Sequence, residues 1–472
     1  MTDHEPHGTE TAPEPHPLRW RLLALLGAAQ LMLIVDVTVV AIALPHIDTA
    51  LGLSREALTW AVSAYTLAFG GLMLLGGRIA DLAGAKRVVL TGLILFTAAS
   101  LTAGLADSTE MLLGGRIAQG VGAALMSPAA LSLVVTLFDG AERHKALGVW
   151  SALGGGGAAL GLLLGGLLTA GPGWSWVFYV NVPIGVVLAV ALAIMLPRRV
   201  PAASRARLDV LGALLVTASS AVLIYALIGA GDRGWFTAAT GLLVLAALVG
   251  YGLFALWQRA ARSPLVDLAL LVRRPVATGT FLILMATALM IAGFFLGTFY
   301  FQHALGYGAL RTGLLFLPVA VATMLGANAT GRVLARTGGR PPAVIGLLVA
   351  AAGLAVPALW MNAVAVAVGV AVAGAGTGAL FVVASATALG QVAPHEAGVA
   401  SGIVSTFHEF GASIGAAVVS SVAAASLIGD TLGGFTDGFT VAAVAAAAGA
   451  LVAAVLTPRR AAAPAAAGHP VH

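Results

Sequence analysis

Three ionisable residues lie within long apolar stretches of this chain, where a lone charge is costly. Asp36 lies in LIVDVTVVAIALP, Arg116 in LLGGRIAQGVGAA and Glu409 in STFHEFGASIG. A charged side chain at the centre of a bilayer costs about 2.5–3.5 kcal/mol on insertion scales, so such residues usually have a partner or a function. A buried carboxyl group can take up and release a proton, and a nearby arginine can bias that exchange. These three residues form the predicted proton-coupling set.

Asp36 has a functional and a structural interpretation. In the functional one, its carboxyl group faces a central, water-accessible cavity and binds a proton or balances the charge of a cationic substrate. In the structural one, Thr38 or a neighbouring helix satisfies the carboxylate. Because intramembrane acids are functional by default, we expect the first.

Arg116 and Glu409 each leave two interpretations open. Arg116 either biases the protonation of a nearby acid or binds backbone carbonyl groups of a neighbouring helix, and its five donors suit both roles. Gln119 and Gly120 share its helical face at i+3 and i+4, and the glycine lets another helix approach. Glu409, next to His408, is either a second proton or cation site or a hydrated acid near the membrane boundary.

The pattern required for enzymatic chemistry is missing from the sequence. The chain contains no cysteine, which excludes disulfides and thiolate metal sites. The run Gly154–Gly157 lacks the Lys-Ser/Thr ending and the preceding strand of a phosphate loop. We therefore expect neither an enzyme nor a resident cofactor or metal. The energy for any transport must then come from an ion gradient.

The elements that position these residues are predicted to be membrane-spanning helices. Hydrophobic residues make up 60% of the 472 residues and charged residues only 9%, whereas soluble domains contain about 25% charged residues. Mean hydropathy is +1.00, which indicates an integral protein of the lipid bilayer. We predict fourteen transmembrane helices near residues 20–44, 58–77, 88–106, 111–137, 146–170, 177–196, 209–230, 238–258, 276–301, 312–335, 342–360, 364–390, 399–426 and 438–457.

The basic residues predict how these helices are oriented. Cytoplasmic loops are enriched in Lys and Arg, and an even number of spans places both termini on one side. With both termini in the cytoplasm, all but four of the 24 Lys and Arg residues fall on the cytoplasmic side, the exceptions being Arg55, Arg116, Arg233 and Arg311. Basic clusters scattered in this way indicate topology rather than a nucleic-acid partner.

An internal repeat divides the spans into two halves. GRIADLAGAK, after the second predicted span, matches GRVLARTGGR, after the tenth, in its Gly-Arg start and in the spacing of a later glycine and a basic residue. Such repeats are typical of secondary transporters. The predicted fold is an all-α membrane protein with two six-helix halves and two inserted helices. Its expected parts are a disordered cytoplasmic tail at 1–19, the halves at 20–196 and 276–457, the insert at 209–258, and a second disordered cytoplasmic tail at 458–472.

The sequence also resembles a known family. GRIADLAGAK resembles the cytoplasmic loop signature of the major facilitator superfamily. LIVDVTVVAIALP resembles the first-span signature of its fourteen-span drug:proton antiporter branch, and LLGGRIAQGVGAA resembles the fourth-span motif, with Arg116 at the arginine position. WSWVFYVNVPIG and YFQHALGYGALRTGLLFLP resemble the starts of the sixth and tenth spans in that branch. The resemblance covers nearly the whole chain between the tails.

The resemblance implies the major facilitator fold and a proton-coupled efflux transporter of multiple drugs or antibiotics that works by alternating access. It also implies a cytoplasmic gating loop, in which Asp81 caps a helix N-terminus or pairs with an arginine. The other residues of this loop are Gly77, Gly84, Lys86 and Arg87.

The antiporter motif of the fifth span is present with one departure. Its glycines are Gly157, Gly161, Gly165 and Gly166, and they allow close helix packing. Leu162 stands where the family carries proline, so the proline kink is lost.

The substrate is expected to be a hydrophobic or cationic small molecule, exchanged for protons. Tyr65, Gln302 and His408 are the candidates for lining a substrate cavity, although such residues also serve packing. One alternative is a dedicated exporter of a single metabolite, such as an antibiotic or a siderophore. Another is a non-transporting membrane sensor or assembly subunit, for which the chain offers little extramembrane surface. We expect a monomeric multi-pass protein of a bacterial cytoplasmic membrane.

Overall fold

The computed structural model describes residues 18–196, 208–390, 392, 396–428 and 432–457, and within these it contains only helices. The predicted tails at 1–19 and 458–472 lie almost wholly outside the described residues. In chain order the first helices are α1 (Arg19–Leu51), α2 (Arg55–Ala83), α3 (Ala85–Gly104), α4 (Thr109–Leu137), α5 (Gly140–Ala170), α6 (Trp176–Tyr179) and α7 (Asn181–Met195). The inserted segment contains α8 (Val210–Arg233), α9 (Ala238–Ala260) and α10 (Leu268–Val272). The remaining helices are α11 (Arg274–Phe299), the π-helical turn η1 (Tyr300–Ala304), α12 (Ala309–Thr337), α13 (Arg340–Leu359), α14 (Ala363–Leu389), α15 (Ala397–Val422), α16 (Ala424–Ile428) and α17 (Gly433–Leu456).

The described helices agree with the fourteen predicted spans. Thirteen are long and apolar enough to cross a membrane, counting α6 with α7 and α11 with η1 as single spans. The fourteenth, α5, contains a shorter apolar stretch, Gly157–Ala170. Several helices extend beyond the predicted bounds: α2 covers Arg55–Ala83 rather than 58–77. The difference arises because hydropathy marks the apolar core of a span and not the helical turns that continue past it.

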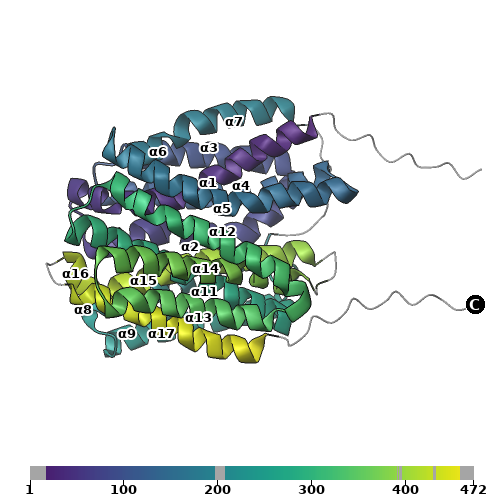
Figure 1. Ribbon diagram of the computed structural model, residues 1–472. Coiled ribbons are helices and arrows are strands. Elements are labelled where there is room, and N and C mark those ends of the chain that lie inside the picture. The colour runs from purple at the N-terminus through teal and green to yellow at the C-terminus, as the bar shows by residue number, and fades with distance from the viewer. Residues whose placement is uncertain (1–17, 197–207, 391, 393–395, 429–431, 458–472) are drawn as a thin grey trace, which may run out of the picture.

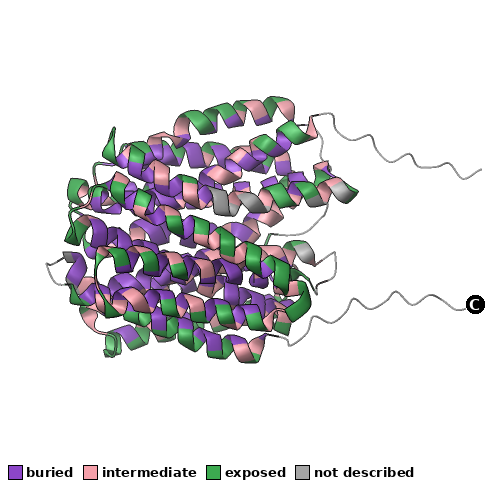
Figure 2. Ribbon diagram, viewed as in Figure 1, coloured by how far each residue is buried: buried purple, intermediate pink, exposed green. Residues whose placement is uncertain are grey.

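The helices gather into two bundles and an inserted pair (Figure 1). In the first bundle α2 and α3 pack on α4, while α1 packs on α5. In the second, α11, α12 and α13 pack on α14, and α13 also packs on α17. Two seams join the bundles, one between α2 and α15 and the other between α5 and α12. Buried residues concentrate along the interior of this arrangement (Figure 2).

The inserted helices lie beside the α2–α15 seam, because α8 contacts both α2 and α15 and carries α9 on its other side. Asp209, the N-cap of α8, closes the base of the pair by accepting hydrogen bonds from the Gly212 amide at 2.9 Å, Trp257 Nε1 at 2.7 Å and Gln258 Nε2 at 2.7 Å. Burial of the carboxyl group acts to raise the pKa of Asp209, but these hydrogen bonds to the ionised form outweigh it and lower the pKa below its ordinary value.

The two copies of the sequence repeat have the same backbone conformation at their later glycine. Gly84, between α2 and α3, has φ of 91°, and Gly338, between α12 and α13, has φ of 73°. A side chain is strained in this region of φ, so a glycine ends the helix at both places. The start of α1 and the end of α17 lie at the same end of the molecule, as an even number of spans requires (Figure 1).

Candidate functional site

A network of buried polar side chains surrounds Asp36 in the first bundle. Asp36 is only 1% exposed, and Arg116 Nη1 lies 2.5 Å from its Oδ2 atom. Gln119 Nε2 and Asn181 Nδ2 donate to Asp36 Oδ1 over 3.0 and 3.1 Å. Four helices supply the network: Asp36 comes from α1, Arg116 and Gln119 from α4, Asn181 from α7, and Ser100, whose Oγ accepts from Gln119 at 2.8 Å, from α3. The carboxylate is therefore fully partnered by neighbouring helices.

Arg116 is held at several points, with an acid and a backbone carbonyl group of a neighbouring helix among its contacts. Its Nε donates to the backbone carbonyl of Ala61 at 2.8 Å, while Nη1 also donates to Gln119 Oε1 at 2.9 Å. Its guanidinium carbon lies 4.4 Å from the centroid of the Tyr65 ring. Such a cation–π contact gains strength where water is excluded. Arg116 thus binds both a neighbouring backbone and an acid.

The short distances between these helices depend on small residues in α4. A methyl group on Gly120 would lie 2.5 Å from the Tyr65 carbonyl oxygen of α2, and one on Gly122 would lie 2.7 Å from the Phe96 amide of α3. Glycines that allow backbones to approach are the usual means of helix packing in membranes. They bring Arg116 within reach of α1 and α2 at the same time.

The network contains one negative and one positive charge, which form a buried ion pair. Removing one partner of a buried ion pair leaves an uncompensated charge and costs about 3–5 kcal/mol. A proton bound to Asp36 would have this effect on Arg116. The pair can therefore convert proton binding into a rearrangement of α1 against α4. In the present conformation Asp36 does not face an open cavity, and Thr38 is not its partner, because the Thr38 hydroxyl donates to Val35 O at 3.1 Å.

Sequence reasoning did not assign Asn181 or Ser100 to this site. Both are polar residues in apolar stretches and both are almost fully buried. That signal is weak, since most buried serines and threonines of this chain bond to their own helix, as Thr97 does with Leu93 O. Only the packing of α3 and α7 against α4 distinguishes them.

Glu409 lies outside the Asp36 network, on α15 at the α2–α15 seam. It is 8% exposed, and His408 Nδ1 lies 3.2 Å from its Oε1 atom. A methyl group on Gly70 of α2 would lie 2.7 Å from Glu409 Cβ, so glycine permits this approach. The ring of Tyr65 lies under Arg116, and its buried hydroxyl has no hydrogen-bond partner within the described residues.

The four glycines of the antiporter motif lie at helix–helix contacts. Gly157, Gly161 and Gly165 face α1, where added methyl groups would meet Ile34, Thr38 and Val39 respectively. Gly166 faces α12, where an added methyl group would lie 2.9 Å from Leu310 Cα. Leu162, at the proline position, is also at this contact, since its carbonyl oxygen would lie 2.5 Å from a methyl group on Gly313.

All the gating-loop residues except Gly84 lie on helices, and Gly84 alone separates α2 from α3. Asp81 lies in the last turn of α2, and α3 begins after Gly84 without a side-chain cap. The expectation that Asp81 caps the N-terminus of a helix is therefore not met at α3 in this conformation. Within the described part of the chain Asp81 forms no ion pair, although the charge of Arg78 acts on it. Lys86 Nζ donates to the carbonyl oxygens of Ala193 at 2.9 Å and Leu196 at 2.5 Å, at the C-terminal end of α7. A methyl group on Gly77 would make an ordinary contact with Pro128 Cβ of α4 at 3.7 Å, and Arg87 is exposed.

The residues predicted to line a substrate cavity lie in three different places. Tyr65 is fully buried under Arg116. Gln302 of η1 donates from Nε2 to the carbonyl oxygen of Ile42 in α1 at 2.9 Å, which ties the two bundles together. The ring of His408 lies 5.9 Å from that of Phe381 on α14, with its side chain 38% exposed. Of the three, only His408 offers a polar surface to a ligand.

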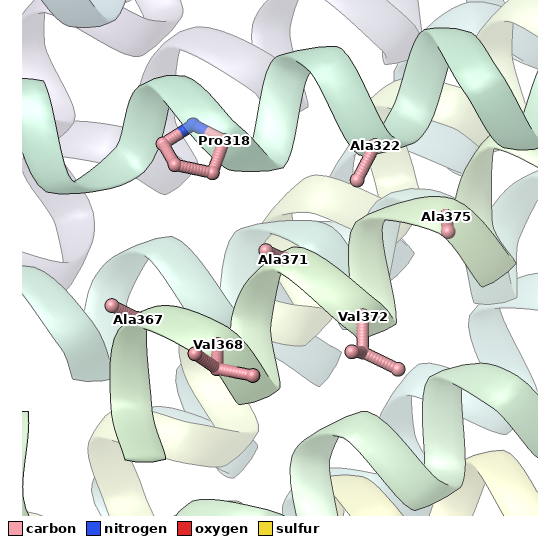
Figure 3. A pocket seen from close by; sticks show the side chains of 7 residues that line it. All are labelled: Pro318, Ala322, Ala367, Val368, Ala371, Val372 and Ala375. Carbon is pink, nitrogen blue, oxygen red and sulfur yellow. The ribbon is translucent and has the colours of Figure 1, made fainter. Parts of the chain in front are cut away.

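A separate groove of about 340 Å³ lies between α12 and α14 and contains none of the predicted site residues. Figure 3 shows its small apolar side chains: Pro318 and Ala322 from α12, and Ala367, Val368, Ala371, Val372 and Ala375 from α14. It offers no polar group to a proton or a cation.

Known proteins resemble this chain at two levels, some in sequence and others in fold. A family profile described as Major Facilitator Superfamily matches residues 26–416. The chain is 38% identical over 411 residues to the puromycin resistance protein of Streptomyces alboniger, covering 85% of this chain and 81% of that protein. It is 34% identical over 406 residues to the cephamycin export protein of Amycolatopsis lactamdurans, covering 83% and 82%. An auto-inhibited POT family peptide transporter matches with a TM-score of 0.64 at 17% identity, over 92% of this chain and 96% of that chain.

Proposed function

Because the chain belongs to the Major Facilitator Superfamily, within its fourteen-span drug-exporter branch, we propose that it exports hydrophobic drugs or antibiotics in exchange for protons. Membership of this family makes it a multi-pass membrane transporter and not an enzyme. The observation that carries the proposal is the buried pair of Asp36 and Arg116, which can hold a proton-linked charge within the membrane.

Proton coupling works through the balance of charge in this network. With Asp36 ionised, its negative charge balances the positive charge of Arg116, and the ion pair holds α1 and α4 together. A proton on Asp36 releases Arg116, which then favours an arrangement where water or another acceptor reaches it. Glu409, at the α2–α15 seam, supplies a second proton or cation site. A substrate that competes with the proton completes the exchange, with the two bundles alternating between inward and outward access.

The motif glycines and the gating segment serve this alternation. Gly161 and Gly166 sit where α5 slides on α1 and on α12. Asp81, unpaired within the described residues, is available to pair with a basic group in another conformation. We place the Gly84 end of α2 and both termini in the cytoplasm of a bacterial cell, with the protein acting as a monomer in its membrane.

The substrate range is either broad, as in a multidrug exporter, or restricted to one compound, as in a dedicated exporter. The puromycin resistance and cephamycin export proteins each bear the name of one antibiotic, which favours the dedicated exporter as the second candidate. Membership of a transporter superfamily argues against a non-transporting sensor. Growth of an efflux-deficient host on puromycin, a cephamycin and unrelated lipophilic cations separates the two exporters, since a dedicated exporter protects against one class alone.

The role of Asp36 is tested with Asp36→Asn, which keeps the side-chain size and removes the charge. In proteoliposomes with an imposed pH gradient, we expect gradient-driven export to be lost. Ser219→Ala, on the inserted helix α8 and away from the network, serves as the control and should retain export. Full gradient-driven export by Asp36→Asn would overturn the assignment.

A further inference from the structure

The seam between α2 and α15 is polar along its length, although it lies inside the membrane-spanning part of the protein. On α2 the seam residues follow one helical face at spacings of three or four, and α15 presents a matching face. We call this set the hydroxyl seam: Arg55, Thr59, Ser63 and Thr66 of α2, with Thr406, Glu409, Ser413 and Ser420 of α15. All eight are less than 9% exposed.

Direct contacts connect the seam across the two bundles. Thr66 Oγ1 lies 2.6 Å from Ser413 Oγ, and the Ser413 hydroxyl also reaches the Ser63 carbonyl oxygen at 3.4 Å. Thr406 Oγ1 donates to the Gly70 carbonyl oxygen at 3.2 Å, one turn from Glu409. The seam thus runs from the start of α2 to the acid at the middle of α15.

The end of the seam opposite Glu409 has an ion pair that reaches solvent. Arg55 Nη2 donates to the Ile228 carbonyl oxygen at 2.9 Å and forms an ion pair with Asp232 of α8. Arg55 Nη1 donates to the Ser420 carbonyl oxygen at 3.4 Å. The Asp232 side chain is 58% exposed, whereas that of Arg55 is only 2% exposed. The distribution of basic residues assigns this end to the extracellular side.

Several polar atoms at or next to the seam have no hydrogen-bond partner. Ser63 Oγ and Arg55 Nε are buried within it, and Tyr65 OH, Thr217 Oγ1 and Ser421 Oγ are buried beside it. Buried polar groups in proteins are almost always satisfied, if not by protein then by ordered water. Thr59, Thr66 and Ser420 donate to carbonyl oxygens of their own helices, as Ser219 does with Leu215 O. Ser63 is the seam hydroxyl without a hydrogen-bond partner among the described residues, and water is its remaining partner.

We propose that the hydroxyl seam holds a file of water molecules and conducts protons between the Arg55–Asp232 end and Glu409. Each water or hydroxyl oxygen accepts one proton and passes on another, so that one proton leaves the outer water and the Glu409 carboxylate becomes a carboxylic acid. His408 on α15 and Tyr65 on α2 are the titratable groups beside this acid. The route deepens the proposed proton exchange, because it gives Glu409 a path to one side of the membrane while Asp36 is closed.

The absence of cysteine from the chain provides a direct test of water in the seam. Ser63→Cys and Ser413→Cys place a thiol in the seam, and Ser219→Cys places one in the contact between α8 and α9, where Gly250 packs against it. The purified full-length variants are exposed to Ag⁺, which binds thiolates. The remaining thiols are counted by mass after denaturation and alkylation.

We expect both seam thiols to react about tenfold or more faster than the thiol at position 219, because a dry buried thiol reacts only after local opening of the structure. Equal rates at all three positions would overturn the proposal. This readout requires no transport activity, so its result is independent of whether the protein exchanges protons for drugs.

The conducting role is tested separately with Thr66→Val, which keeps the shape of the side chain and removes its hydroxyl group. Proton uptake into proteoliposomes loaded with puromycin, followed with an enclosed pH dye after external acidification, should fall about tenfold. Thr287→Val, on α11 and outside the seam, is the control. An unchanged rate in Thr66→Val refutes conduction by the seam. Absence of proton uptake in the unmodified protein would instead refute proton-coupled export of puromycin, while the Ag⁺ result would still decide whether the seam contains water.

Discussion

Asp36 exchanges the water it would have in the unfolded chain for three side-chain donors from two other helices. Arg116 is the decisive one, because it alone brings a compensating charge. Gln119 joins the two, since it donates to Asp36 and accepts from Arg116. A site of this kind can hold a carboxylate in the membrane without water, provided that every member is present.

The geometry of Arg116 predicts that lysine cannot replace it. An ammonium group has no planar fork with which to reach Asp36, Gln119 and the Ala61 carbonyl oxygen together. We expect Arg116→Lys to fold but to export slowly.

We expect Arg116→Leu to lose about 3–5 kcal/mol of stability at neutral pH, because the Asp36 charge is left buried and unpaired. Thermal unfolding measures the loss, and the double variant Asp36→Asn/Arg116→Leu should recover part of it. An Arg116→Leu protein as stable as the unmodified one would contradict the pairing.

At the scale of helices, the contact between α1 and α5 depends on the absence of side chains at the motif glycines. A methyl group at position 161 would collide with the Thr38 hydroxyl. We expect Gly161→Ala to reduce both stability and export, and Thr38→Ala in the same chain to restore them in part. The second change removes the hydroxyl group but leaves the Cβ atom of residue 38 at 2.9 Å and Val35 O at 3.0 Å from the added methyl group. Melting temperature and transport rate of the single and double variants are the measurements.

Gly148 provides the matched control on α5, since a methyl group there meets no atom within 4 Å. Gly148→Ala should be neutral or stabilising by up to about 1 kcal/mol, because alanine favours the helix. Equal losses in Gly148→Ala and Gly161→Ala would show that helix propensity, and not contact with α1, is responsible.

The base of the inserted pair predicts a pH dependence of stability. The folded pKa of Asp209 is lower than its unfolded value, so its contribution is present above the unfolded value of about 3.9 and is lost as pH falls through the folded pKa. We expect Asp209→Asn to destabilise the protein near neutral pH and to weaken the loss of stability on acidification below about pH 4. Melting temperatures of both proteins over this range provide the test. Parallel curves for the two proteins would exclude a contribution from Asp209.

At the scale of the whole molecule, alternating access requires that the two seams between the bundles open and close. Thr66 and Ser413 face each other across one seam with their hydroxyl oxygens 2.6 Å apart. We expect Thr66→Cys/Ser413→Cys to form a disulfide on oxidation and to stop export, and a reductant to restore it. The single-cysteine variants control for the loss of each hydroxyl group. Full export by the cross-linked protein would show that this seam remains closed throughout the cycle.

The amino-acid sequence by itself determined the elements and their number. The bilayer accepts only helices or closed barrels with long apolar surfaces, so composition and hydropathy were enough to predict the fourteen spans. The repeat was readable for a similar reason, because Gly84 and Gly338 must both adopt a positive φ to end a helix. Helix ends beyond the apolar core, such as the last turn of α2 with Asp81, were not readable from hydropathy.

Only the tertiary structure decided which side chains meet. Asp36 and Arg116 are 80 residues apart in the chain, and Asp36 and Asn181 are 145 apart. No local pattern encodes such pairs, because they depend on how closely the glycines of α4 and α5 allow the helices to pack. The same holds for the hydroxyl seam, where Thr66 and Ser413 are separated by 347 residues. Sequence identified the charges that the membrane would not tolerate alone, and packing between distant helices supplied their partners.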